Sequence, residues 1–169
     1  MKYSKRPKID VPLQPIDLWL DRFSFLLFFL IWFYALFNFF NLPDSIPLHF
    51  DAHGNADSFG SKNGIWILMG LMTFMFAGLY VLGKFPNLHN YTVQITEDNA
   101  LKNYRFSTRI LRIVNLFDLL LFAYIIKKTM TYNGDNSSEL GCWFLPFVLG
   151  VSGVFLIFIF IYASKLNSK

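Results

Sequence analysis

Long apolar segments alternate with short polar ones along the chain, and this pattern predicts its helices. Four segments stay apolar over about the length that an α-helix needs to cross a bilayer, roughly 17–25 residues. They cover residues 18–40, 64–83, 110–126 and 142–163. We expect each to be a membrane-spanning helix. Short links between them predict an all-α fold, a four-helix transmembrane bundle.

The same pattern divides the chain into a basic tail, residues 1–16, and a single four-span membrane domain, residues 17–169. Asp17 and Asp21 lie one turn apart at the start of the first span, where the helix dipole favours acids. The helix that leads into the third span is expected to begin at Thr96, because a capping hydroxyl followed by two acids is a typical helix start.

Composition agrees with a membrane protein. Hydrophobic residues make up 54% of the chain and charged residues only 15%, whereas soluble domains carry about 25% charged residues. The one cysteine, Cys142, excludes a disulfide within the chain and a Cys-x-x-Cys redox pair. Basic residues do not alternate with aromatic ones in a surface patch, so we expect no nucleic-acid partner.

The distribution of the 15 Lys and Arg residues predicts the orientation in the membrane. If the N-terminus is cytoplasmic, only Lys62, Lys127 and Lys128 fall on the opposite side. Cytoplasmic segments are the ones enriched in Lys and Arg. We therefore expect both termini in the cytoplasm and residues 42–63 outside, as an ordered extracytoplasmic loop between the first two helices.

The 42–63 loop concentrates the polar chemistry of the chain. Two prolines, Pro43 and Pro47, hold its entry extended. The candidate residues for ligand binding or for ordering the loop are His49, Asp51, His53, Gly54, Asp57 and Lys62. The two imidazoles share one face whether the segment is extended or helical.

Three interpretations of this loop compete. In the first, His49, Asp51 and His53, with Asp57, bind a divalent metal and leave one position for water, as in a membrane metal-dependent enzyme. In the second, the loop is a recognition surface for a peptide or a lipid headgroup. In the third, it is a structural cap in which His49 and Asp57 hydrogen-bond the turns. Apart from this possible metal, the sequence suggests no cofactor.

Two further groups of polar residues lie in or near the third span. Asp118 falls near the middle of the span, with Asn115 one turn away as a hydrogen-bond partner. An intramembrane acid of this kind suggests a proton or cation site of an accessory or transport subunit, or else a structural acid.

The second group is a basic stripe. Its members step by three, four and three residues and so share one helix face: Lys102, Arg105, Arg109 and Arg112. We expect these side chains to reach anionic lipid headgroups of the bilayer. A docking face for a cytoplasmic partner is the alternative.

The loop also carries a family resemblance. The order Leu42-Pro43-x-x-Ile46-Pro47-x-His49-Phe50-x-x-x-Gly54-x-x-Asp57 resembles the signature of a bacterial membrane domain of unknown function. That domain also forms the N-terminal part of the immunity proteins that protect bacilli from the sporulation-delaying toxin. The resemblance covers roughly residues 20–83 and implies a multi-pass protein of the bacterial cytoplasmic (inner) membrane. It implies no reaction and no cofactor.

The chain departs from those immunity proteins in lacking their further C-terminal membrane region. It also has Asp51 where relatives often have Asn. We therefore expect a non-enzymatic multi-pass membrane protein that senses or binds an extracytoplasmic peptide or protein partner, or acts in an immunity-like way, through the 42–63 loop. The metal-dependent enzyme and the Asp118-dependent transport subunit are the alternatives.

Overall fold

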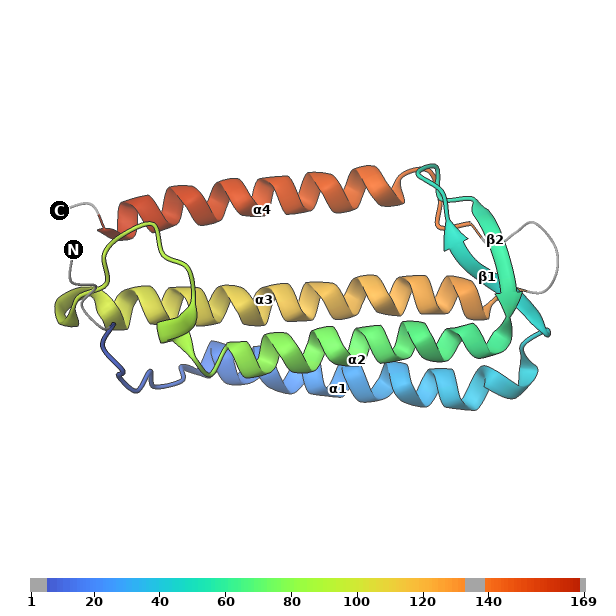
Figure 1. Cartoon of the computed structure of the whole chain (residues 1–169), viewed down its shortest axis with the longest axis horizontal. Coiled ribbons are helices and arrows are strands. Elements are labelled where there is room, and N and C mark those ends of the chain that lie inside the picture. The colour runs from blue at the N-terminus through green and yellow to red at the C-terminus, as the bar shows by residue number, and fades with distance from the viewer. Residues whose placement is uncertain (1–5, 133–138, 168–169) are drawn as a thin grey trace.

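The computed structural model describes residues 6–132 and 139–167, which form a bundle of long helices with one β-hairpin (Figure 1). The helices are α1 (Pro15–Asn38), α2 (Ile65–Leu82), α3 (Glu97–Met130) and α4 (Phe144–Asn167), the strands are β1 (Ser45–Phe50) and β2 (Ala56–Ser61), and single 3₁₀ turns cover Phe39–Asn41, Lys62–Gly64 and Pro86–Leu88.

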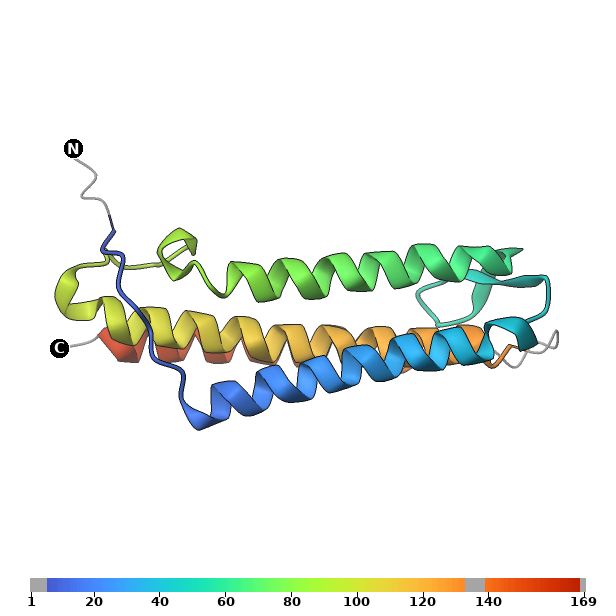
Figure 2. The same ribbon diagram turned by 90° about the horizontal axis from the view of Figure 1, so that it is seen from below.

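Helix α3 lies at the centre of the bundle. Figure 1 shows α1 and α2 along one side of it and α4 along the other, and the turned view in Figure 2 shows α1 and α2 on either side of α3. The described chain starts and finishes at one end of the bundle, which we call the termini end, and the β-hairpin lies at the opposite, hairpin end. Both ends of the chain thus lie on the same side of the bundle, while its orientation in a membrane stays a prediction.

The expectation of a purely all-α fold is wrong, because β1 and β2 pair as an antiparallel hairpin. Periodicity did not reveal it, since the register shifts between Pro47 and His49 and again between His49 and Phe50. Such bulges interrupt the alternation of buried and exposed positions that identifies a strand in a sequence. The hairpin, rather than an irregular loop, therefore connects α1 to α2.

Three described helical segments are long and apolar enough to cross a membrane: Pro15–Asn41, Lys62–Leu82 and Phe144–Asn167. Helix α3 is not among them, because Arg112, Asp118 and Lys127 interrupt its most apolar stretch. Arg112 instead contacts Asp21 of α1, and Asn115 donates to Phe76 of α2. The chain is thus compatible with a membrane protein, and a fourth span through α3 stays a prediction.

The main core fills the space between α1, α2 and α3. Its fully buried side chains include Ala35 from α1, Met69 and Met72 from α2, and Leu119 and Ile126 from α3. Unbranched methionines fill such irregular gaps well. These contacts join the three helices into one packed unit.

Helix α4 differs from the others, because none of its residues is buried. Aromatic pairs attach it to α3 near both ends: Tyr124 stacks on Phe144 at the hairpin end, and Phe106 stacks on Tyr162 at the termini end. Helix α4 is therefore a peripheral element of the bundle.

Candidate functional sites at the two ends of the bundle

The hairpin is fixed to the bundle by apolar residues and by one glycine. Ile46 and Pro47 are completely buried beneath it. Gly54 adopts a left-handed backbone conformation, with φ of 85°, and its carbonyl accepts a 2.8 Å hydrogen bond from the Leu140 amide. The hairpin is thereby joined to the connector between α3 and α4.

Asp51 orders the turn between the strands. Its carboxylate accepts hydrogen bonds from the backbone amides of His53 and Asn55, both at 2.8 Å, and from the Asn55 side chain at 3.0 Å. These donors, the Asn55 side chain first, hold the pKa of Asp51 below its ordinary value of 3.8. The ionised carboxylate is therefore part of the turn.

Acidification is expected to loosen this turn. Because the pKa of Asp51 is lowered on folding, its contribution is complete above the ordinary carboxyl pKa and is lost as pH falls through the lower, folded value. Hydrogen exchange at the His53 and Asn55 amides, corrected for intrinsic rates, should show less protection at about pH 3 than at about pH 6. Asp51→Asn has no titrating group there and should show no such change; an equal change in this variant would exclude Asp51 as the cause.

The His49 and Asp57 side chains form a hydrogen bond across the hairpin, on its solvent side. His49 Nδ1 lies 2.6 Å from Asp57 Oδ1, and the two side chains are 69% and 45% exposed. Lys62 is not part of this pair. Its ammonium lies 3.1 Å from the Asp44 carboxylate, just before β1 begins. His53 is exposed in the turn.

The four proposed metal ligands thus do not share one position. His49 pairs with Asp57, while Asp51 faces the turn amides. Within residues 6–132 and 139–167, no group of three His, Cys, Asp or Glu side chains is arranged to hold a metal ion. Both Asp51 oxygens already accept hydrogen bonds, two on Oδ1 and one on Oδ2.

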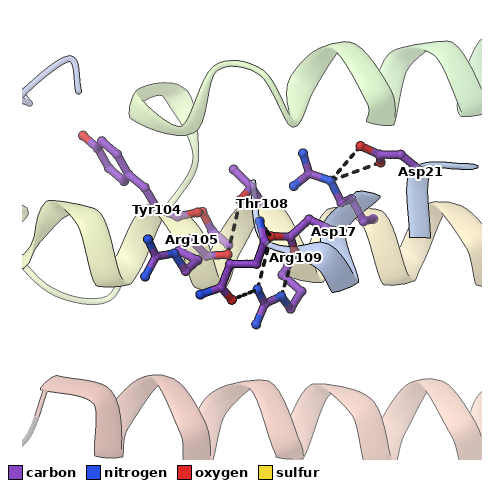
Figure 3. A network of polar contacts seen from close by, with 9 residues as sticks. Asp17, Asp21, Tyr104, Arg105, Thr108 and Arg109 are labelled. Carbon is purple, nitrogen blue, oxygen red and sulfur yellow. Dashed lines mark hydrogen bonds and ion pairs between the residues drawn. The ribbon is translucent and has the colours of Figure 1, made fainter. Parts of the chain in front are cut away.

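A second polar site lies at the termini end, between α1 and α3 (Figure 3). Asp17, only 3% exposed, accepts hydrogen bonds from Arg109 at 2.8 and 3.2 Å. The same carboxylate accepts a hydrogen bond from the Gln14 backbone amide at the start of α1. An acid was expected at this helix start. One turn further along, Arg112 Nε lies 3.1 Å from both oxygens of Asp21.

Two of the four basic residues expected at lipid headgroups are therefore engaged inside the bundle. Lys102 donates to the Leu166 carbonyl at the end of α4, and Arg105 is partly buried. The sequence contained a signal for the two ion pairs. Asp17 and Asp21 are four residues apart in α1, and Arg109 and Arg112 are three residues apart in α3. Both spacings are about one helical turn, so the two acids can meet the two arginines. Contact of the stripe with lipid headgroups stays a prediction.

Asn115 and Asp118 do not form the expected pair. The Asn115 side chain donates instead to the Phe76 carbonyl of α2, at 3.2 Å. Asn115 is 5% exposed, and Asp118 is partly buried one turn further along α3. Asn115 therefore connects α3 to α2.

Sequence reasoning missed a third polar cluster, in the connector before α3. The His89 ring is 3.0 Å from the Ser107 hydroxyl and 2.9 Å from the Leu82 carbonyl. The Tyr91 hydroxyl contacts Ser107 at 2.7 Å and donates to Pro86. Burial raises the pKa of Tyr91 to about 12, so this phenol remains a hydrogen-bond donor near neutral pH. No local motif marks these residues, because the contacts join positions 16–18 residues apart.

The N-terminal tail packs on this cluster. Arg6 donates to the carbonyls of Asn87 and His89, and the Tyr104 hydroxyl donates to the Pro7 carbonyl. Arg6 and Pro7 of the predicted basic tail are thus bound to the connector and to α3; residues 1–5 lie outside the described chain.

Comparison with known proteins identifies one segment that matches a domain family. Residues 26–73 match the model of a domain of unknown function, DUF1648. That segment contains most of α1, the whole hairpin and the first half of α2. An uncharacterized protein of Archaeoglobus fulgidus is 25% identical over 94% of this chain and 93% of its own length. No solved structure matches the chain.

Proposed function

We propose that the chain is a non-enzymatic integral membrane protein whose hairpin recognises a peptide or protein partner outside the membrane. The supporting observation is the exposed His49–Asp57 pair on a hairpin that other residues hold in place. Ile46, Pro47 and Gly54 make the contacts that attach the hairpin, and Asp51 orders its turn.

The energetics of the pair support this assignment. An ion pair between exposed side chains contributes about 0–1 kcal/mol to stability. The His49–Asp57 pair is therefore expected to add little to the stability of a structural cap. Phe59, two residues after Asp57 on β2, is 47% exposed and packs against the Tyr132 ring. A rigid surface with a paired donor and acceptor next to an aromatic ring suits peptide recognition, because little ordering is required on binding.

The test uses a photoreactive amino acid at Ser58, which is exposed next to Asp57. In living cells, this position should give a discrete crosslinked product that disappears in the His49→Ala/Asp57→Ala double variant. The variant should reach the membrane at the wild-type level, and its free energy of unfolding should fall by no more than about 1 kcal/mol. The same crosslinker at exposed Asn90, in the α2–α3 connector, is the control.

Two results would contradict the proposal. If the double variant is lost from the membrane, the pair is part of a structural cap. If Ser58 and Asn90 give the same products, the hairpin has no partner of its own. The alternative transport function predicts instead that Asp118→Asn abolishes ion-coupled activity while the hairpin variants retain it.

A further inference from the structure

A cavity at the termini end, with a volume of about 290 Å³, is lined by the N-terminal tail, the end of α2 and the residues after it, α3, and Asp21 of α1. Small-molecule sites occupy about 300–1,000 Å³, so this one suits a small ligand or the headgroup of a larger one. Leu79, Tyr80 and Leu111 supply apolar wall. The cavity is far from the hairpin and independent of the function proposed above.

Two buried polar atoms in the cavity residues have no hydrogen-bond partner among the described residues: Arg112 Nη1 and Asn115 Oδ1. Buried polar atoms are almost always satisfied, and an exception requires a specific explanation. The orientation of the Asn115 amide is fixed, because its nitrogen donates to the Phe76 carbonyl. Its oxygen therefore remains as an acceptor, while Arg112 offers a donor one turn away.

The charges around the cavity are balanced. Asp10 and Asp21 contribute two carboxylates to its lining, and Lys84 and Arg112 contribute two cations. A purely anionic ligand would meet the acids, and a purely cationic one would meet the basic groups. Asp21 and Arg112 already pair with each other. A ligand that carries both charges can meet Asp10 and Lys84 together with Arg112 Nη1 and the Asn115 oxygen.

We infer that this cavity binds a small zwitterionic group, with an anionic oxygen on Arg112 and an N–H of its ammonium on Asn115. A phosphoethanolamine group has both parts on a short linker. It could come from the headgroup of a bilayer lipid or from a free small molecule. The cavity lies where α2 ends and the polar connector begins, at Gly83 and Lys84, which is the depth of a headgroup if α2 spans a bilayer.

The soluble source is tested on the full chain in phosphatidylcholine nanodiscs. O-phosphoethanolamine should raise the thermal unfolding midpoint saturably, because a ligand that binds only the folded state stabilises it. Ethanolamine alone and inorganic phosphate alone should give much smaller shifts. The lipid source is tested by native mass spectrometry in nanodiscs that contain phosphatidylethanolamine. Phosphatidylcholine serves as the matched lipid, since its quaternary ammonium has no N–H to donate to Asn115.

Arg112→Gln should weaken binding from either source by about tenfold or more, because it removes a charged donor. Arg109→Gln is the matched control: it removes a guanidinium that also pairs with an α1 aspartate, but Arg109 does not line the cavity. It should retain affinity within about twofold. Asn115→Leu gives a second test: it removes the oxygen that accepts from the ammonium and should also weaken binding, while the Asp17–Arg109 and Asp21–Arg112 pairs remain.

The inference is overturned if wild type binds neither source saturably, which would mean that water alone fills the cavity. It is also overturned if Arg109→Gln loses as much affinity as Arg112→Gln, or if phosphate or ethanolamine alone binds as tightly as the zwitterion. Retention of phosphatidylethanolamine without binding of O-phosphoethanolamine assigns the site to a lipid, and the reverse assigns it to a free ligand.

Discussion

Asp17→Ala is expected to lower the free energy of unfolding by about 3 kcal/mol, measured by denaturation in mixed detergent micelles. Removing one partner of a buried ion pair costs about 3–5 kcal/mol. The lower part of that range applies, because the Arg109 side chain is 30% exposed and retains its hydrogen bond to Gln14. Loss of the Gln14 amide hydrogen bond at the start of α1 contributes further.

Asp44→Ala is the matched control. Its carboxylate also pairs with a cation, Lys62, but its side chain is fully exposed, so the expected loss is much smaller than for Asp17→Ala. A double-mutant cycle between Asp17→Ala and Arg109→Ala should give a coupling energy of about 1–3 kcal/mol. Equal effects of Asp17→Ala and Asp44→Ala would show that the Asp17–Arg109 pair is not buried as described.

Gly54→Ala is expected to separate the hairpin from the α3–α4 connector and to lower the free energy of unfolding by about 3 kcal/mol. The left-handed backbone alone costs an alanine about 1–2 kcal/mol. The added Cβ would lie 2.6 Å from the Gly141 carbonyl oxygen and 2.8 Å from its nitrogen. These are backbone atoms, so the connector itself must shift. The hydrogen bond from Leu140 to Gly54 should be lost with it.

Hydrogen exchange at the Leu140 amide measures this separation directly and should become faster. Gly150→Ala is the control, since a Cβ there meets no atom within 4 Å and alanine is favoured over glycine in a helix by about 0.5–1 kcal/mol. Unchanged protection of Leu140 in Gly54→Ala would mean that the hairpin tolerates a side chain at this turn.

The helices could be located from the sequence because their signals are local. Thr96 was expected to begin a helix, and α3 does begin directly after it. The apolar runs 18–40 and 64–83 coincide closely with α1 and α2. Each of these signals depends on residues within a few turns of one another, so a single sequence contains all the information.

The contacts of the polar residues could not be predicted in the same way. The loop was expected to bring His49, Asp51 and His53 to one face, but the His49 ring contacts Asp57, and the Asp51 carboxylate accepts the amides of the turn. Arg109 was expected at lipid headgroups, and its partner Asp17 lies 92 positions away in the chain. A basic side chain has the same local signal whether it meets a phosphate or a carboxylate, so only the packing of α1 on α3 decides between them.

The paired charges also determine how α1 and α3 can move. Both helices run from the termini end to the hairpin end (Figure 2). A slip of one turn, about 5.4 Å, would leave two charges without partners: Asp21 and Arg109 in one direction, and Asp17 and Arg112 in the other. Helices α1 and α3 therefore resist sliding past each other along their axes. If a state of the hairpin is transmitted to the opposite end, we expect α1 and α3 to tilt or rotate together as one rigid body.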